Sequence, residues 1–404
     1  MAVMKNCSNS YDAQNGGALV IFMLVVVFAG MVALFSVLDG ATIKIERDKK
    51  TAEALAEAKS TLIGYAIKNS AIVSAGYLPN PDLGPGINTE GSSASGMGGA
   101  DISLIGKLPW RTLGISSLQD GSGECLWYVV SGRFKNNPKT SALNWDTQGQ
   151  IDIIDGSGNI VATNLAAIVV SPNQSLDAQS RTLADVSLTQ CGGNYDARNY
   201  LDSYDISNAV SGEVNYFIGS ANNRQPANVN NKRFVIEKND YYNDRFLFVT
   251  VDEIFGLISR RADFALQVTA LLDDADFNLE VQTVPILGGK GTDNVNCSII
   301  SNAAQKTFCN NWKEMLLLTE LPTTSSIVVD GLPTTTSCNR VLIFGGRRTA
   351  AQQRLNSSNK ADPANYLEGA NLTAFSIPFA TSSSFNGLST FSASNPSADI
   401  LRCL

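Results

Sequence analysis

The residues GALVIFMLVVVFAGMVALFSVL, at positions 17–38, decide the architecture predicted for this chain. They run for 22 residues without a charged side chain, and about 20 apolar residues suffice for a helix to cross the hydrocarbon core of a bilayer. We therefore expect a transmembrane helix. A helix buried in a soluble core is one alternative, and a cleaved secretory signal is another. The apolar region of such a signal is normally only about 7 to 15 residues long, which favours the transmembrane interpretation.

The next segment, residues 39–75, predicts an amphipathic stalk helix. It is rich in strong helix formers, and apolar residues such as Leu55, Ala58, Leu62 and Ala66 recur at spacings of three and four. Asp39-Gly40 separates the two segments, and because glycine lowers helix propensity we expect a bend or local melting there. The first segment would then face lipid or other helices, and the second would cover a folded head.

Residues 76–404 predict a large head domain with room for two subdomains. It begins with a Gly-, Pro- and Ser-rich loop, and a loop-like tail follows Phe375. Short β-branched and aromatic runs bounded by turn residues predict strands at 125–131, 159–171, 215–220, 233–237, 245–251, 325–330 and 340–346. Helical spacing predicts helices at 252–272 and 303–318. The expected fold class is α+β: a long, hydrophobic-then-amphipathic N-terminal helix carrying a mostly antiparallel, β-rich head with a few helices.

Composition excludes several classes of function. The net charge is −7, and no Lys/Arg-rich run interleaved with aromatic residues occurs, so nucleic acid is not an expected partner. The chain contains no histidine, which removes the usual general base and the commonest zinc ligand. Sequence signatures of phosphate loops, zinc proteases and α/β-hydrolases are also missing. We expect that the protein is not an enzyme and binds no cofactor. A carboxylate-based glycosidase is the remaining enzymatic alternative.

The cysteines bear on which side of the membrane holds the head. Basic residues after the apolar segment outnumber those before it, which by the positive-inside rule would leave the head in the cytoplasm. Once Cys7 is set aside, however, six cysteines remain, an even number that fits three disulfides in an oxidising compartment. Their order and spacing favour the pairs Cys125 with Cys191, Cys297 with Cys309, and Cys338 with Cys403. The alternative is six buried thiols in a cytosolic domain.

Acidic residues offer few candidate sites. The group Asp273, Asp274 and Asp276 is a weak calcium candidate, and no other metal site is expected. Two further pairs, Asp152 with Asp155 and Asp240 with Asp244, are most simply turn formers. Trp110 and Trp127 have apolar neighbours and are expected to be core anchors, with sugar stacking as the alternative.

Several motifs together resemble the type IV pilin-like proteins, which are made as prepilins for type IV pili and type II secretion systems. They are NGGALVIFMLVVV (15–27), LIGYAIKN (62–69), GYLPNPD (76–82), GKLPWRTLGI (106–115), DGSGECLWYVVS (120–131), NDRFLFVTVDEIF (243–255) followed by Arg260-Arg261, RVLIF (340–344) and DPANYLEG (362–369). The resemblance implies a leader, residues 1–16, that a prepilin peptidase removes after Gly16 or Gly17. The mature chain would then begin at Gly17 or Ala18, with residues 17–38 as the membrane and filament-core helix.

Two departures from the family pattern refine this expectation. Asn80 stands where large prepilin-type proteins commonly carry cysteine, so one disulfide of that group is missing. The fifth mature position, where major pilins carry glutamate, is Ile21 or Phe22 here. Without a carboxylate the subunit cannot neutralise a neighbour's buried N-terminal amine. The resemblance therefore implies a minor or tip subunit of a pilus or pseudopilus, acting in filament assembly, surface display or adhesion.

The expected partners are other pilin or pseudopilin subunits, prepilin peptidase and the inner membrane. The protein would reside in the inner membrane as a precursor and then in the periplasm or in a cell-surface filament. The alternative function is a bitopic, membrane-anchored periplasmic binding or envelope protein that never polymerises.

Overall fold

The computed structural model describes residues 15–68, 72, 75–84, 89–96, 99–139, 142–155, 157, 159–176, 179–182, 190–202, 232–236 and 242–404. Cys7, the expected strand at 215–220 and Asp240 lie outside these residues. Side chains are described for residues 20–31 and 41–68 of the first helix.

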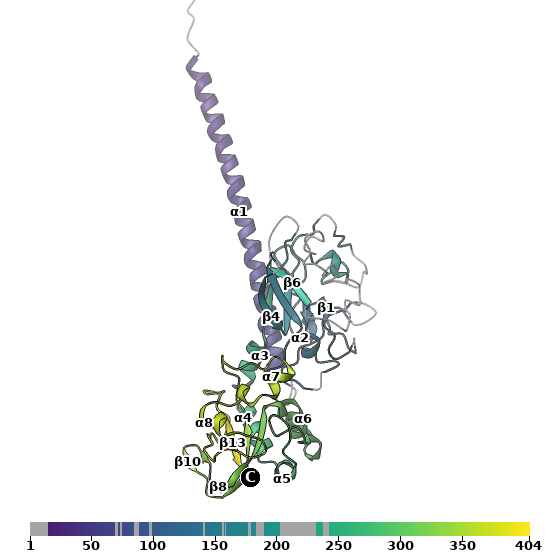
Figure 1. Ribbon diagram of the computed structural model, residues 1–404. Helices are drawn as coiled ribbons and strands as arrows, with labels where there is room; N and C mark the ends of the chain where they lie inside the picture. The colour runs from purple at the N-terminus through teal and green to yellow at the C-terminus, as the bar shows by residue number, and fades with distance from the viewer. Residues whose placement is uncertain are drawn as a thin grey trace, which may run out of the picture.

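The longest element is helix α1 (Asn15–Lys68), which projects far beyond the head domain and enters that domain with its C-terminal part (Figure 1). Its backbone stays helical through residues 39–40, so the expected interruption at Asp39-Gly40 does not occur. One glycine costs only about 1 kcal/mol in a helix that good helix formers continue on the C-terminal side. The helix ends at Lys68, seven residues before the predicted boundary, and Gly76 closes the reversal through its N–H to the carbonyl of Ala66.

The C-terminal part of α1 lies on a four-stranded antiparallel sheet with the order β1-β2-β5-β7. Its strands are β1 (Leu104–Lys107), β2 (Trp127–Val130), β5 (Ala167–Ser171) and β7 (Arg245–Val249). Every residue of β2 and β5 is buried, because alternate side chains enter two different hydrophobic clusters. This explains why both strands are continuous apolar runs rather than alternating patterns.

A second sheet covers the other face of β2 and β5. Its order is β4-β3-β6, formed by β4 (Ile160–Leu165), β3 (Ile151–Asp155) and β6 (Lys232–Ile236), and β3 runs parallel to β6. Trp127 and Ile168 from the first sheet share a hydrophobic cluster with Ile153 and Phe234 from the second. The N-terminal half of the head therefore has three layers: helix, sheet and sheet.

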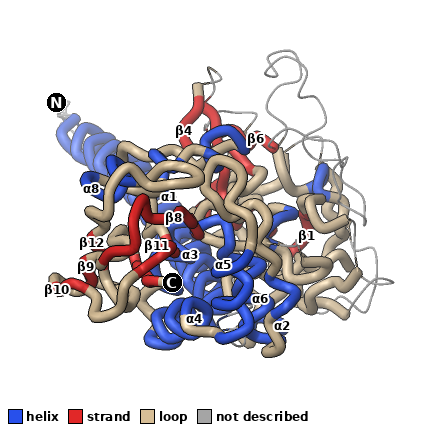
Figure 2. The backbone as a smooth tube through the Cα atoms, turned by 60° about the horizontal axis from the view of Figure 1, so that its bottom comes forward, coloured by secondary structure: helices blue, strands red, loops and turns tan. Residues whose placement is uncertain are grey.

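The C-terminal half of the head contains most of the other helices, including those labelled α3 to α6 in Figure 2, and a three-stranded antiparallel sheet with the order β13-β11-β8. The main helices are α3 (Val251–Ile258), α4 (Ala262–Leu272), α5 (Ala275–Thr283) and α6 (Ala303–Trp312), and the sheet strands are β8 (Leu316–Ser325), β11 (Cys338–Phe344) and β13 (Ile400–Cys403). Shorter elements are α2 (Trp110–Leu113), α7 (Ser357–Ala361), α8 (Gly369–Ala374), β9 (Val328–Val329), β10 (Leu332–Pro333) and β12 (Asn386–Gly387).

One hydrophobic core joins α1 to both halves of the head. It runs from Leu55 and Leu62 of α1 through Phe255 of α3 to an aromatic group around Trp145. The Trp145 ring lies 4.7 Å from that of Trp312, and Phe264, Phe344 and Phe391 surround the pair. The buried stripe of α1 is therefore part of the hydrophobic core of the head.

The α+β class and the predominance of antiparallel pairing are confirmed. The helix predicted at 252–272 is divided into α3 and α4 at residues 259–261. The helix predicted at 303–318 is wrong at its end: α6 stops at Trp312, and Leu316 opens strand β8, because pairing with β11 outweighs the local apolar pattern. Within the part of the chain that the structure describes, no helix combines the length and the apolar character needed to cross a membrane.

Candidate functional site

The most unusual surface of the protein is the N-terminal part of α1. Large apolar side chains at positions 20–28 and 31 are exposed, with exposed fractions between 47% and 66%. Consecutive residues of a helix point in all directions around its axis, so this part of the helix is apolar on every face. Exposed apolar surface of this extent marks an interface with lipid or with other protein.

The residues expected at the processing site lie at the start of this helix. Gly16, Gly17 and Ala18 belong to the first turns of α1, and their side chains are outside the described set. Ile21 and Phe22 are both exposed, at 64% and 66%. Either candidate for the fifth mature position therefore presents an apolar side chain to the surroundings.

The C-terminal part of α1 has different surroundings. Ala54, Leu55, Ala58, Leu62 and Ala66 are at most 7% exposed and form one stripe against the first sheet and α3. This confirms the predicted amphipathic pattern from Leu55 onward.

Polar contacts fix the position of α1 on the head. Asp48 pairs with Arg245 of β7 at 2.8 Å, and Lys59 pairs with Glu253 of α3 at 2.6 Å. The hydroxyl of Thr51 accepts a hydrogen bond from the N–H of Gly121 at 2.9 Å. Asp48, Thr51 and Lys59 all belong to the C-terminal part of α1, which also carries the buried stripe.

Gly121 belongs to the turn Asp120-Gly-Ser-Gly, which reaches the backbone of α1. A Cβ at Gly121 would lie 2.2 Å from the carbonyl oxygen of Arg47, so only glycine allows this approach. Asp120 is fully buried and organises the turn: one carboxylate oxygen accepts from the N–H groups of Ser122 and Glu124, and the other from Ser171 and Asn173. The turn in the motif DGSGEC therefore holds the head against the stalk part of α1.

The motif LPNPD (78–82) forms a second buried group of hydrogen bonds. Asn80 donates hydrogen bonds to the carbonyls of Ala94 and Asn137, so its amide joins two loops. Asp82 accepts from the hydroxyl of Tyr195 at 2.7 Å. Lys107 lies over the ring of Tyr195, and burial lowers the pKa of its amine to about 8 despite the attraction of Asp82.

Three disulfides cross-link the head, and they join the pairs that order and spacing predict. The Cα–Cα distances are 5.4 Å for Cys125–Cys191, 5.8 Å for Cys297–Cys309 and 5.1 Å for Cys338–Cys403. The last pair connects β11 to β13 and so ties the C-terminal tail to the sheet. Disulfides of this kind form in oxidising compartments.

The predicted acidic and aromatic sites are accounted for by structural contacts. Asp273 pairs with Arg402 at 2.6 Å, Asp274 caps α5 through the N–H of Phe277, and Asp276 accepts from Ser301. Among the described residues, no group of three His, Cys, Asp or Glu side chains could hold a metal ion. Each aspartate therefore has its own partner: a strand for Asp273, the N-terminus of α5 for Asp274 and a loop for Asp276.

The other candidates also have structural partners. Asp152 and Asp155 accept backbone hydrogen bonds from Asn164 and from Ser157 and Asn159, as turn-forming residues do. Trp127 is fully buried against Tyr200, at 5.0 Å between ring centres, which matches the interpretation as a core anchor. Trp110 is half-buried and lies under the guanidinium of Arg111.

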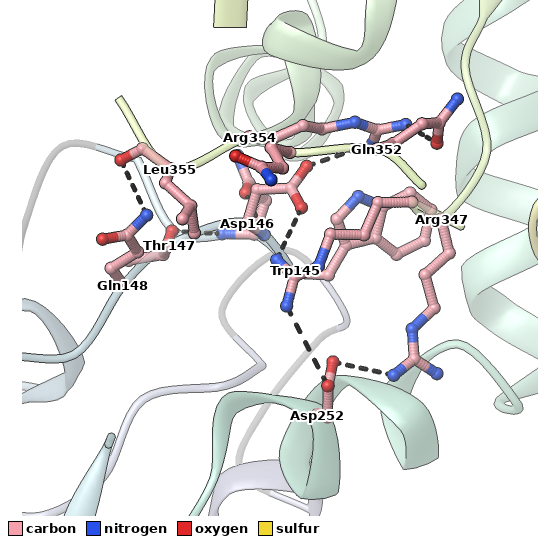
Figure 3. Close-up of polar contacts among 12 residues, drawn as sticks. Trp145, Asp146, Thr147, Gln148, Asp252, Arg347, Gln352, Arg354 and Leu355 are labelled. Carbon is pink, nitrogen blue, oxygen red and sulfur yellow. Dashed lines mark hydrogen bonds and ion pairs between the residues drawn. The ribbon is translucent and has the colours of Figure 1, made fainter. Parts of the chain in front are cut away.

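A polar network that the sequence did not reveal connects the two halves of the head (Figure 3). Asp146 is 2% exposed and accepts from Arg354, itself fully buried, at 3.1 Å, and from Arg348 at 3.3 Å. Arg348 and Arg347 both reach Asp252 in the first turn of α3. Arg354 also donates to the carbonyls of Gly346 and Asn365 and lies 4.1 Å from the ring of Tyr366. Because its hydrogen-bond donors have partners, this buried arginine serves as a structural connector.

A buried pair of carboxyl groups is the second feature missed from the sequence. Asp202 accepts from the N–H groups of Asn243 and Asp244, and Asp244 accepts from the N–H of Asp202 at 2.8 Å. Burial, and then the charge of Asp202, raise the pKa of Asp244 well above its ordinary value. Burial also raises the pKa of Asp202. In the sequence, Asp244 groups with Asp240, and nothing indicates its contact with Asp202.

No protein family, curated protein or solved structure matches this chain.

Proposed function

We propose that this protein is a minor or tip subunit of a type IV pilus or of a type II secretion pseudopilus. In this proposal residues 17–38 hold the precursor in the inner membrane, and a prepilin peptidase then removes residues 1–16 or 1–17. The mature subunit enters a filament with its head outside the cytoplasm, where it acts in assembly, surface display or adhesion.

One observation carries the proposal: a single helix is apolar and exposed on all faces at one end and built into a folded head at the other. A helix of this kind can pass from lipid into a helical bundle without refolding, because both surroundings cover apolar side chains. Three disulfides in the head support delivery to an oxidising compartment.

Two features favour a minor or tip position over the main shaft. Ile21 and Phe22 provide no carboxylate for a neighbour's N-terminal amine, and a buried amine without a partner is costly. The head is also broad: it lies against one side of the C-terminal part of α1 and extends beyond the end of that helix (Figure 1). A bulky head is easier to place at the end of a filament than in every repeating layer.

The direct test is the N-terminus of the protein isolated from cells. We expect the mature chain to begin at Gly17 or Ala18. The double substitution Gly16→Ala and Gly17→Ala should leave the precursor uncleaved, measured by mass spectrometry of the N-terminal peptide. Gly30→Ala is the matched control, because a methyl group there meets no neighbouring atom and the residue lies away from the cut.

A wild-type chain with an intact Met1 terminus would contradict the proposal. It would instead favour a bitopic envelope protein that does not polymerise.

A further inference from the structure

A cavity of about 330 Å³ lies between α1 and the head, beside residues 43–48 of the helix. Segments that are far apart in the chain form it. Residues of α1 line one side, and the other side includes Gln174 from the loop after β5 and Arg245 at the start of β7. Its volume lies at the lower end of the range of small-molecule binding sites.

The described residues that line this cavity carry a net positive charge. Its cations are Lys44, Arg47 and Arg245, and Asp48 is the carboxylate among them. Asp48 is paired with Arg245 at 2.8 Å, so these two charges offset each other. Lys44 and Arg47 are exposed, and within the described part of the chain neither forms an ion pair. The cavity therefore offers two cations to an anionic ligand.

If residues 17–38 span the membrane as proposed, this cavity lies at the membrane surface. Lys44 follows Leu38 by six residues, so with a rise of 1.5 Å per residue it lies about 9 Å beyond the hydrocarbon core. The headgroup layer is about 5 to 7 Å thick on each side of that core. Helix side chains lean toward the helix N-terminus, which here is toward the membrane. The long side chains of Lys44 and Arg47 therefore extend toward the lipid phosphates.

An apolar surface connects the cavity to the membrane. Ile43 lines the cavity and is 53% exposed, and the large side chains at positions 20–28 and 31 of the same helix are exposed and apolar. A ligand with an anionic head and apolar chains has a matching surface for both parts.

We propose that this cavity binds the headgroup of an anionic phospholipid. The phosphate accepts hydrogen bonds from Lys44 and Arg47, and the acyl chains pass Ile43 and follow α1 into the bilayer. A guanidinium suits phosphate because it donates two parallel hydrogen bonds. The proposal rests on the proposed function, because it takes residues 17–38 as the membrane span, and it adds a specific lipid partner.

The experiment uses the full chain in micelles of a neutral detergent and native mass spectrometry, which counts the lipids that stay on the protein. The probes are phosphatidylglycerol and phosphatidylcholine with the same acyl chains. Both contain a phosphate, but only phosphatidylglycerol has a net negative charge. We expect one bound phosphatidylglycerol, with an affinity at least about tenfold higher than that of phosphatidylcholine.

Inorganic phosphate distinguishes a lipid from a soluble anion. Added at the same concentration, it should leave phosphatidylglycerol bound, because it has no chains to pack against α1 and the micelle. Displacement of the lipid by inorganic phosphate would overturn the lipid as the ligand.

Three variants locate the site. Lys44→Gln with Arg47→Gln removes both unpaired cations and should weaken phosphatidylglycerol binding at least about tenfold. Lys49→Gln with Lys50→Gln is the matched control, because it makes the same change in charge in the same segment of α1 but neither residue lines the cavity. This control should bind phosphatidylglycerol as wild type does. Gln174→Glu adds a carboxylate at an exposed position of the lining and should weaken binding about threefold.

Equal affinity of wild type for the two lipids, or equal losses in the two double variants, overturns the proposal. Thermal unfolding of each variant distinguishes a lost site from a lost fold, and the comparison of lipids on wild type needs no variant. The outcome is separate from the test of N-terminal processing. A chain that keeps Met1 but prefers phosphatidylglycerol would overturn the filament role alone, whereas a processed chain without this preference would overturn the lipid site alone.

Discussion

The two ends of α1 share one continuous helical backbone and almost nothing else. At residues 20–31 large side chains are apolar and exposed, whereas Leu55, Leu62 and Ala66 are at most 4% exposed in the core of the head. The buried end is held by side-chain packing and by ion pairs from Asp48 and Lys59, and the exposed end has no such contacts among its described residues. Two segments of one helix can therefore be stabilised by different surroundings, and the side chains of each segment determine which surroundings it needs.

The same substitution at both ends should separate these two roles most strongly. Leu62→Asp removes a fully buried leucine and places an unpaired charge in the core, so we expect the head to lose more than about 4 kcal/mol of unfolding free energy. Leu24→Asp should leave the stability of the head within about 0.5 kcal/mol of wild type, because Leu24 is 51% exposed. Urea denaturation followed by tryptophan fluorescence measures both.

Leu24→Asp has its own expected effect. If residues 17–38 span the inner membrane as proposed, a carboxylate within that span costs about 2.5 to 3.5 kcal/mol, so this variant should shift from the membrane fraction toward the soluble fraction. The comparison of the two ends fails if Leu24→Asp destabilises the head as much as Leu62→Asp does.

The parts of the structure that sequence could predict are those with a local period. The spacing from Leu55 to Ala66 identifies the buried stripe of α1, and the apolar run at 125–131 predicts strand β2. The single strand predicted at 159–171 is instead two strands, β4 and β5, which belong to different sheets. Leu316–Leu318 shows the limit: a short apolar run fits a helix or a strand, and pairing with β11 decided for the strand. Order along the chain was enough for the cysteine pairs because each partner was the next cysteine in line.

The candidate sites were harder to predict than the fold. Asp146 and Arg354 are separated by 208 positions, and no local pattern marks either residue as buried. Asp202 and Asp244 also come from segments far apart in the chain, and their carboxylates accept hydrogen bonds from backbone N–H groups of the opposite segment. Long-range polar contacts leave no periodic signal, because each member is a single charged residue among many exposed ones.

Substitutions in the buried network around Asp146 should have effects of intermediate size on the buried end of α1. Asp146→Ala leaves the guanidinium of Arg354 buried without its carboxylate partner, so we expect the free energy of unfolding to fall by about 3 to 5 kcal/mol. Because Asp252 of this network adjoins Glu253, which holds Lys59, hydrogen exchange should rise at residues 51–66 of α1 and stay unchanged at residues 20–31.

Two further variants make this prediction specific. Arg347→Ala removes only a partly exposed partner of Asp252 and should cost at most about 1 kcal/mol. The double substitution Asp146→Ala with Arg354→Met should recover part of the lost stability, because no buried charge remains unpaired. Equal exchange at the two ends of α1 in the Asp146→Ala protein would show that the network does not support the buried end.

The smallest expected effect concerns the ion pair between the buried end of α1 and helix α3. Burial alone would raise the pKa of Glu253, but hydrogen bonds from Lys59 and Thr250 outweigh it and lower that pKa below its usual 4.5. A carboxyl group whose pKa is lower in the folded than in the unfolded protein stabilises the fold at pH values above its unfolded pKa. This stabilisation is lost as the pH falls through its folded pKa. Since the side chain of Glu253 is 39% exposed, solvent screening limits the contribution to roughly 0.5 to 1 kcal/mol.

Glu253→Gln isolates that contribution, because glutamine can still accept from Thr250 and so preserve the cap of α3. We expect wild type to be more stable than the variant by this amount at pH 7 and equally stable near pH 3, as measured by urea denaturation across the range. Lys59→Met should cost little more once Glu253→Gln is present, since the partner charge is already gone. A stability difference that stays constant from pH 7 to pH 3 would mean that packing of the side chain, not its charge, joins α3 to the stalk.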